Sequence, residues 1–399
     1  MSAPILFGSP RAQKNYINPK IEGVSQRTTN LGYTQAQNVS RYVIPPPPPT
    51  NPVDIRWGGE NYGYISGKGV PNSANTIERY SFASDGNATT VGSLNFQNPL
   101  NFWGRQGVSS YSAGYDLQTG NNLPEATFAN DIVKVPFASI VSNANIGEIA
   151  IPQRDYASHA EANVSGYLSG GTWGPQAPIP DLGPYPSPSF YLTDNIQKFP
   201  FASDAPSVST GTLSAYTADA TGGSDTNVAG YTVGETYFPT SGPPWPSTLP
   251  SNAPAPGGFQ VSDQLKFPFA TGNTSTNIAN FFIKPNSSGV GQLSFSSCSP
   301  TAYFISGAGS PVTQTYDGID KVVFANDTQL ASTTATLLDN GISGASASST
   351  TFGYTAGGYF TNNFYESRIQ KFSMINDTNA TVVGTLVSSP NIGGSGFHE

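Results

Sequence analysis

The chain repeats one short pattern, and this repetition constrains the fold more than any other feature. Residues 369–386 read IQKFSMINDTNATVVGTL and residues 196–213 read IQKFPFASDAPSVSTGTL, with eight identical positions in an ungapped alignment of eighteen. Six stretches carry a related pattern with a basic residue at its third position: Arg79, Lys134, Lys198, Lys266, Lys321 and Lys371. Successive basic residues lie 55, 64, 68, 55 and 50 positions apart. The chain therefore contains six units of similar length.

An aromatic residue followed three positions later by glycine precedes each of these stretches. The six copies are Tyr64–Gly67, Tyr111–Gly114, Tyr167–Gly170, Tyr231–Gly234, Phe304–Gly307 and Tyr354–Gly357. A period near fifty residues with a glycine-bearing strand is typical of a kelch-type β-propeller, in which small sheets bury their faces by packing around an axis. We predict an all-β fold, a six-bladed kelch-like β-propeller over residues 55–399 with an extended, non-globular N-terminal arm. We also expect residues 54–59 and 389–399 to complete one blade together.

The composition agrees with strands and turns rather than helices. The chain holds 43 Gly, 34 Pro, 20 Tyr and 23 Phe, and no window shows a sustained helical period of apolar residues. Two structural roles are open for the repeated basic residue: an exposed strand position that discourages edge pairing, or one polar contact made in every blade. The loop at 82–92 (FASDGNATTVG) and its relatives at Asp204, Asp327 and Asp377 have one Asp each, which favours turn chemistry over a calcium site.

The first 54 residues contain no repeat. Residues 1–50 hold five basic residues and one acid, a balance of +4, so the chain total of -8 leaves -12 on residues 51–399. We expect residues 1–42 to be an extended basic arm and residues 43–54 (VIPPPPPTNPVD) to be a stiff proline-rich spacer. The alternatives are a flexible tail and a charge that serves only solubility. The candidate anchoring residues of the arm are Arg11, Lys14, Tyr16, Lys20, Arg27, Tyr33 and Arg41.

Units 2, 3 and 4 carry extra residues between the aromatic and the basic position. This gap is 15, 23, 31, 35, 17 and 17 residues in the six units. The two longest insertions, 172–195 and 235–259, are rich in proline and aromatic residues. Their candidate ligand- or partner-binding residues are Trp173, Tyr185, Tyr191, Tyr237 and Trp245, because rigid aromatic side chains bind with little loss of entropy. The alternative is that these side chains fold back over the blades.

No motif in the sequence indicates catalysis. G-x-S-x-G, the P-loop and H-E-x-x-H are missing, and a single cysteine, Cys298, excludes an internal disulfide. The two histidines, His159 and His398, have no metal-binding pattern around them. We therefore predict that the protein is not an enzyme and uses no cofactor or metal. The start of the chain lacks a secretory signal, and no apolar run approaches the ~20 residues that cross a bilayer. Neither membrane insertion nor nucleic-acid binding by the acidic body is expected.

The repeats resemble the kelch-like repeats in virion structural proteins of tailed phages, especially those of marine cyanobacteria. The best matches are residues 353–386 (GYTAGGYFTNNFYESRIQKFSMINDTNATVVGTL) and 77–94 (IERYSFASDGNATTVGSL). The resemblance covers residues 57–399, with departures at 273–282 and 326–338, and it does not cover the arm.

The resemblance implies a virion component, often at the host-contacting surface. The composition of the loops favours the tail or neck appendage or fibre type, assembled in the host cytoplasm. Its arm would bind other virion proteins, and its propeller would contact a host surface glycan or receptor, a virion protein or further copies of itself. Three alternatives are a capsid decoration protein, a soluble carbohydrate-binding propeller, or lectin, and a carbohydrate-active enzyme whose catalytic carboxylates would converge on the axis.

Overall fold

A computed structural model describes most of the propeller region. The described residues are 59–66, 76–94, 106–118, 120–122, 127–150, 157–173, 191–226, 228–237, 262–271, 274–280, 294–298, 301–305, 308–309, 314–315, 319–324, 327–329, 335–338, 341–360, 364–387 and 395–399. The chain divides into Met1–Val53 and Asp54–Glu399, and every described residue belongs to the second unit. The predicted arm (1–42) and spacer (43–54) lie outside the described residues.

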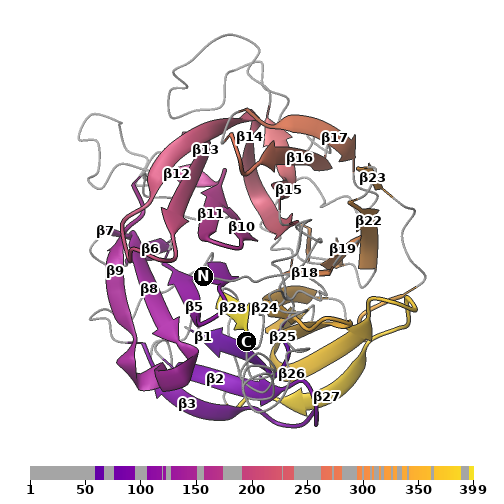
Figure 1. Ribbon diagram of the computed structural model, residues 1–399. Helices are drawn as coiled ribbons and strands as arrows, with labels where there is room; N and C mark the ends of the chain where they lie inside the picture. The colour runs from indigo at the N-terminus through magenta and orange to yellow at the C-terminus, as the bar shows by residue number, and fades with distance from the viewer. Residues whose placement is uncertain are drawn as a thin grey trace, which may run out of the picture. The chain divides into compact units, whose positions relative to one another are not determined.

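The described strands form antiparallel sheets arranged as a β-propeller, which confirms the all-β prediction (Figure 1). The first sheet has the order β28 (Ser395–His398), β1 (Tyr62–Ser66), β2 (Thr76–Ser81), β3 (Thr89–Ser93). The second has the order β4 (Gln106–Ser109), β5 (Ala113–Leu117), β8 (Asp131–Pro136), β9 (Ala144–Glu148). A short 3-10 helix, η2 (Phe137–Ser142), follows β8.

The third sheet is twice as large as the others. It has the order β10 (Ser158–Ala162), β11 (Ser165–Ser169), β13 (Tyr191–Pro200), β14 (Val208–Asp225), β15 (Ala229–Tyr237), β16 (Ser262–Pro268), β17 (Thr276–Asn280), and β12 (Thr172–Trp173) pairs with β13.

Two more four-stranded sheets complete the ring. One is β18 (Ser294–Cys298), β19 (Thr301–Ile305), β22 (Ile319–Val323), β23 (Thr328–Gln329), and the other is β24 (Gly341–Ser348), β25 (Phe352–Phe360), β26 (Phe364–Ser373), β27 (Thr381–Thr385). Two small hairpins stand apart from these sheets: β6 (Gly120–Asn122) with β7 (Thr127–Ala129), and β20 (Ala308–Gly309) with β21 (Gln314–Thr315).

The prediction of six blades is wrong, because the described strands make five large sheets. The reason is β14, which runs without interruption from the outer strand position of unit 3 to the inner strand position of unit 4. It pairs with β13 through Thr212 and Asn195, and with β15 through Asp225 and Gly230. Units 3 and 4 therefore share one eight-stranded sheet, and six sequence repeats build five blades.

Residues near both ends of the propeller region meet in the first sheet, through 395–398 of the expected 389–399 but through β1 rather than through residues 54–59. Strand β28 pairs antiparallel with β1, with Tyr64 opposite Phe397 and Ser66 opposite Ser395. Gly59 does not join this sheet. It forms a parallel bridge to Ser349, beside the end of β24. The ring is thus closed by the last strand of the chain, which becomes the innermost strand of the first blade.

The strand order gives the propeller two different faces. Antiparallel neighbours put the turn between β4 and β5, that between β10 and β11, and that between β14 and β15 on one side, which we call the turn face. The connections between β5 and β8, β11 and β13, and β15 and β16 reach the opposite side, which we call the loop face. The insertions of units 2, 3 and 4 therefore all start from the loop face.

The strand register corrects the aromatic pattern read from the sequence. A tyrosine lies opposite the basic residue in every unit, but in unit 2 it is Tyr115 rather than Tyr111, and in unit 5 it is Tyr303 rather than Phe304. The shared feature is a small residue just before this tyrosine, which is glycine in five of the six units. At Gly63, Gly166 and Gly230 an added Cβ would collide with the aromatic ring of the residue paired with it, Tyr80, Phe199 or Phe267. Glycine is required there because the ring occupies its side-chain space.

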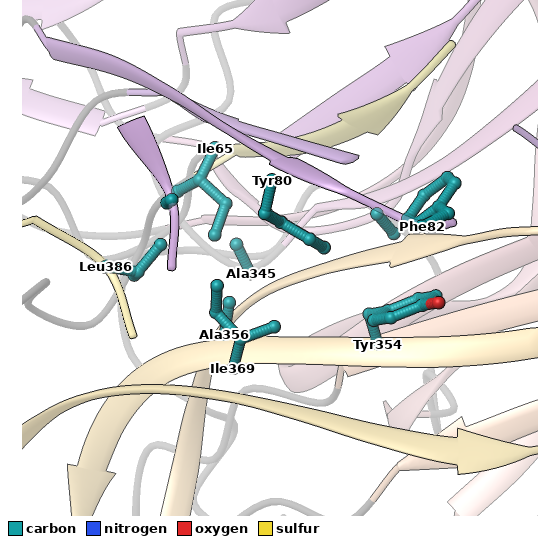
Figure 2. Packing of buried hydrophobic residues seen from close by; sticks show 10 residues of the cluster. Ile65, Tyr80, Phe82, Ala345, Tyr354, Ala356, Ile369 and Leu386 are labelled. Carbon is teal, nitrogen blue, oxygen red and sulfur yellow. The ribbon is translucent and has the colours of Figure 1, made fainter. Parts of the chain in front are cut away.

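Five of these tyrosines are buried, and each packs against an aromatic ring of the following unit. The ring centroids are separated by 5.2 Å for Tyr64–Phe137, 4.8 Å for Tyr115–Phe201, 4.5 Å for Tyr167–Phe269, 4.7 Å for Tyr231–Phe324 and 4.7 Å for Tyr354–Phe82. Figure 2 shows the last of these contacts, where Tyr354 and Phe82 join the final unit to the first among Ile65, Ala356 and Ile369. The same aromatic contact thus seals five junctions around the ring.

Candidate functional site

The repeated basic residues make ion pairs from one unit to the next. Among the described residues, four of them hold an aspartate in the turn of the following unit: Lys134–Asp204 at 2.7 Å, Lys266–Asp327 at 2.7 Å, Lys321–Asp377 at 3.0 Å and Lys371–Asp85 at 3.0 Å. All four aspartates have positive φ, between 46° and 53°. Asp tolerates this left-handed conformation better than most residues, so one side chain both shapes the turn and accepts the lysine.

The basic residues of units 1 and 3 depart from this arrangement. In the units that follow them, 2 and 4, the position that matches the aspartate is occupied by Ile140 and Gly272. Arg79 of unit 1 lies 4.3 Å over the ring of Tyr62, and Lys198 of unit 3 lies 5.7 Å from the ring centroid of Tyr167. Of the two roles left open by the sequence, the repeated polar contact is therefore the one observed in four units. These aspartate turns serve the junctions between units.

A second polar cluster lies where the inner strands converge. A cavity of about 30 Å³ is lined by Gly107 and Ser109 of β4, His159 and Glu161 of β10, Gly223 and Asp225 of β14, Ser346, Ala347 and Ser348 of β24, and Gly396 and His398 of β28. Both histidines of the chain border it. A cavity of this size holds about two water molecules, so a sugar ring does not fit inside it.

Glycines let these inner strands approach closely. An added Cβ on Gly107 would collide with the backbone of Gly396, one on Gly396 with the backbone of Ser346, and one on Gly223 with the backbone of His159. The glycines of these crowded inner strands are not those of the aromatic pattern.

Hydrogen bonds link four inner strands through the cavity wall. The His398 N–H donates to Ser109 Oγ (3.0 Å), the Ser109 N–H donates to Glu161 Oε2 (2.6 Å), and the Glu161 N–H donates to Asp225 Oδ2 (3.2 Å). His398 Nε2 also lies 3.6 Å from Glu161 Oε1, and each of these two side chains is 11% exposed. We call His159, Glu161, Asp225 and His398 the axial cluster.

The axial cluster perturbs the histidine that it encloses. Desolvation lowers the pKa of His159 from 6.5 to about 4, and the nearby His398 adds to this effect. His159 is therefore neutral at neutral pH. Within the described residues, no three His, Cys, Asp or Glu side chains are grouped so that they could hold a metal ion.

Three of the five predicted binding aromatics lie in described strands, and two of them are paired. Trp173 of β12 lies directly opposite Tyr191 of β13. Tyr237 ends β15, where it lies opposite Tyr216 of β14. Thr217, the next residue of β14, pairs with both Thr193 and Thr236. Strands β13 and β15, which carry the ends of the two long insertions, are therefore separated by one strand at the loop face.

The remaining predicted site residues lie outside the described residues. These are Tyr185 and Trp245 of the insertions, and all seven candidate anchoring residues of the arm: Arg11, Lys14, Tyr16, Lys20, Arg27, Tyr33 and Arg41. The sequence reasoning also missed two features. Tyr216 belongs to no repeat motif, and the axial cluster draws on inner strands that share no motif. The signal in the sequence for the axial cluster was that the chain has only two histidines, both of which belong to it.

The fold defines the class of the protein as a β-propeller, and comparison with known proteins adds no relative. No family model matches the chain, and no curated protein matches it. In the part of the chain that the structure describes, no helix is long and apolar enough to cross a membrane.

Proposed function

We propose that the protein is a structural component of a tailed-phage virion, of the tail or neck appendage or fibre type, and that it acts by binding rather than by catalysis. The resemblance of its repeats suggests this class. The observation that carries the proposal is that the two faces of the propeller have different connections.

The chain joins the propeller at the turn face. The Gly59 N–H donates to the Ser348 carbonyl (3.0 Å), and the Asn61 N–H donates to the Glu399 carbonyl (2.9 Å). Ser348 ends β24 just before the turn into β25, and Asn61 immediately precedes β1. Gly59, where the described part of the chain begins, therefore lies at the turn face. An anchor that precedes residue 59 would hold this face toward the particle.

The loop face is then free to meet a host surface. The insertions of units 3 and 4 rise from β13 and β15, and Thr217 of β14 joins these two strands through Thr193 and Thr236. Adjacent strands are about 4.8 Å apart, so the bases of the two insertions lie roughly 10 Å from each other. We assign host contact to the loop face at the ends of β13 and β15, where both insertions begin or end.

The test is recovery of the protein from purified phage particles. A triple variant, Arg11→Glu, Lys14→Glu and Lys20→Glu, reverses charge in the arm. It should lose most of its incorporation, because the docking surface for a basic arm is acidic. A matched control, Lys68→Glu with Arg105→Glu, reverses charge in the propeller and should be incorporated normally. Absence of the wild-type protein from particles would overturn the proposal, and equal incorporation of both variants would overturn the anchoring role of the arm.

A soluble lectin is the second candidate function. The pairing of Trp173 with Tyr191 favours it, since aromatic pairs at the base of a loop are suited to stacking on a saccharide. A lectin requires saccharide affinity in the free protein and makes the arm dispensable. Binding to immobilised cell-surface polysaccharide that survives the triple arm variant and is lost in Trp173→Ala with Tyr191→Ala, together with absence from particles, would establish this function instead.

A further inference from the structure

The axial cluster joins parts of the ring that are not neighbours. His398 belongs to β28, the innermost strand of unit 1, whereas Glu161 belongs to β10, the innermost strand of unit 3. The ion pairs between lysine and aspartate described above all join successive units instead. The contact between His398 and Glu161 therefore connects β28 of unit 1 to β10 of unit 3 near the axis, without involving unit 2.

Strand β28 is short and lies at the inner end of its sheet. It is four residues long and, among the described strands, its sheet neighbour is β1. Its apolar anchor is Phe397, which stacks on Tyr64 at 5.6 Å and lies 6.3 Å from the ring of Phe137. At its end, the Tyr64 hydroxyl donates to Glu399 Oε1 (2.6 Å). The hydrogen bond of His398 to Ser109 and its contact with Glu161 connect this strand to units 2 and 3.

The charges around His398 come from a small set of groups. Strand β10 contributes His159 and Glu161, and β14 contributes Asp225. The cavity-lining residues of β4 and β24 are Gly, Ala and Ser, without a titratable group. On the side of β1, Tyr64 interacts with Glu399 and with Arg79 of β2. Two carboxylates and one neutral imidazole therefore face His398 near neutral pH.

We propose that the axial cluster is an acid-sensitive clasp that holds the closing strand in the ring near neutral pH and releases it on acidification. Protonation of His159 places a positive charge beside His398 in a cavity that holds about two waters. This change acts against β28 and does not act directly on the aromatic contacts between units.

The pH range follows from His159. Its pKa in the folded protein, about 4, lies below its ordinary value of 6.5, so the unfolded chain takes up this proton first. The stabilising effect of the neutral imidazole is complete above pH 6.5 and is lost as the pH falls toward 4. Over this range the equilibrium should shift toward the open form by up to roughly two orders of magnitude.

Hydrogen–deuterium exchange of the full-length protein at pH 7 and pH 4.5 tests the clasp, with exchange referred to unstructured peptides at each pH. The protection of the peptide that contains β28 should fall by roughly tenfold or more at pH 4.5, while the protection of β26 falls less. His159→Gln removes the titrating group and should abolish the difference. Asp204→Asn, which removes a carboxylate at a junction between units, is the matched control and should leave the acid response of β28 intact.

Two results would overturn the proposal. One is equal loss of protection in β28 and β26 in the wild-type protein, which means that acid unfolds the ring as a whole. The other is an unchanged acid response of β28 in His159→Gln. If His159→Gln does not fold, the wild-type comparison of β28 with β26 decides by itself.

Discussion

The units of the ring contact one another in different ways at the junctions between them and on the axis. At the junctions, one tyrosine and one aromatic or basic partner recur from unit to unit, so the same interaction is made many times. On the axis, glycines bring the inner strands together and four titratable side chains interact in an arrangement that occurs once. The repeated contacts therefore stabilise the junctions between units. Residues outside the repeat close the ring and, in our proposal, make this closure depend on pH.

The largest expected effect is the difference in the free energy of unfolding between variants of Tyr115, a junction residue, and of Tyr111, which the sequence pattern selected instead. Tyr115→Ala should lower the free energy of unfolding by about 3–5 kcal/mol, because Tyr115 is buried and its removal leaves a cavity against Phe201. Tyr111→Ala should change it by less than about 0.5 kcal/mol, because Tyr111 is 79% exposed. Urea denaturation of both variants measures the difference. Equal losses would show that the aromatic pattern read from the sequence, not the strand register, identifies the junction residue.

An intermediate effect is expected on the axis. Gly223→Ala should cost about 1–3 kcal/mol, because its Cβ would collide with the backbone of His159, which cannot move aside. Gly92→Ala, on the outer strand of unit 1, should cost less than about 1 kcal/mol. Its Cβ would lie 3.0 Å from Ile140 Cγ2, the end of a side chain that can rotate. Thermal unfolding of the two variants compares them, and a larger loss for Gly92→Ala would contradict the close packing of the axis.

The smallest effect is expected for an ion pair at a junction. The side chains of Lys371 and Asp85 are 17% and 37% exposed, so solvent screens their attraction. A double-mutant cycle of Lys371→Met and Asp85→Asn should give a coupling of about 0.2–1 kcal/mol that weakens in 1 M salt. A coupling that is larger than this, or indifferent to salt, would mean that the ion pairs rather than the aromatic rings hold the units together.

The sequence predicted the parts of the fold that recur. The spacing of Arg79 and the five lysines located every unit, because each basic residue occupies the same strand position. The pattern selected the wrong aromatic residue in two units. Tyr111 and Phe304 satisfy it through Gly114 and Gly307, whereas Tyr115 and Tyr303, which lie opposite the basic residues, do not. A pattern of glycine followed by tyrosine would have found Tyr115, since Gly114 precedes it.

Two other features were beyond the sequence for physical reasons. The merging of units 3 and 4 depends on backbone hydrogen bonds along β14, which no side-chain pattern marks. The axial cluster joins residues as far apart as His159 and His398 through strand ends that share only glycine and small polar residues. Of the candidate binding surface, the aromatic composition was visible from the sequence. That Thr217 joins the bases of both insertions required the strand order.

The closing strand has a consequence for how the protein is made. Strand β1 is among the first parts of the propeller to leave the ribosome, and its partner β28 is synthesised more than three hundred residues later. Until then the nascent propeller carries an open strand edge of the kind that pairs with other chains. Any shortening that removes residues 395–398 would make this transient edge permanent. Such a product should be recovered as aggregates or as chains paired through their first blades.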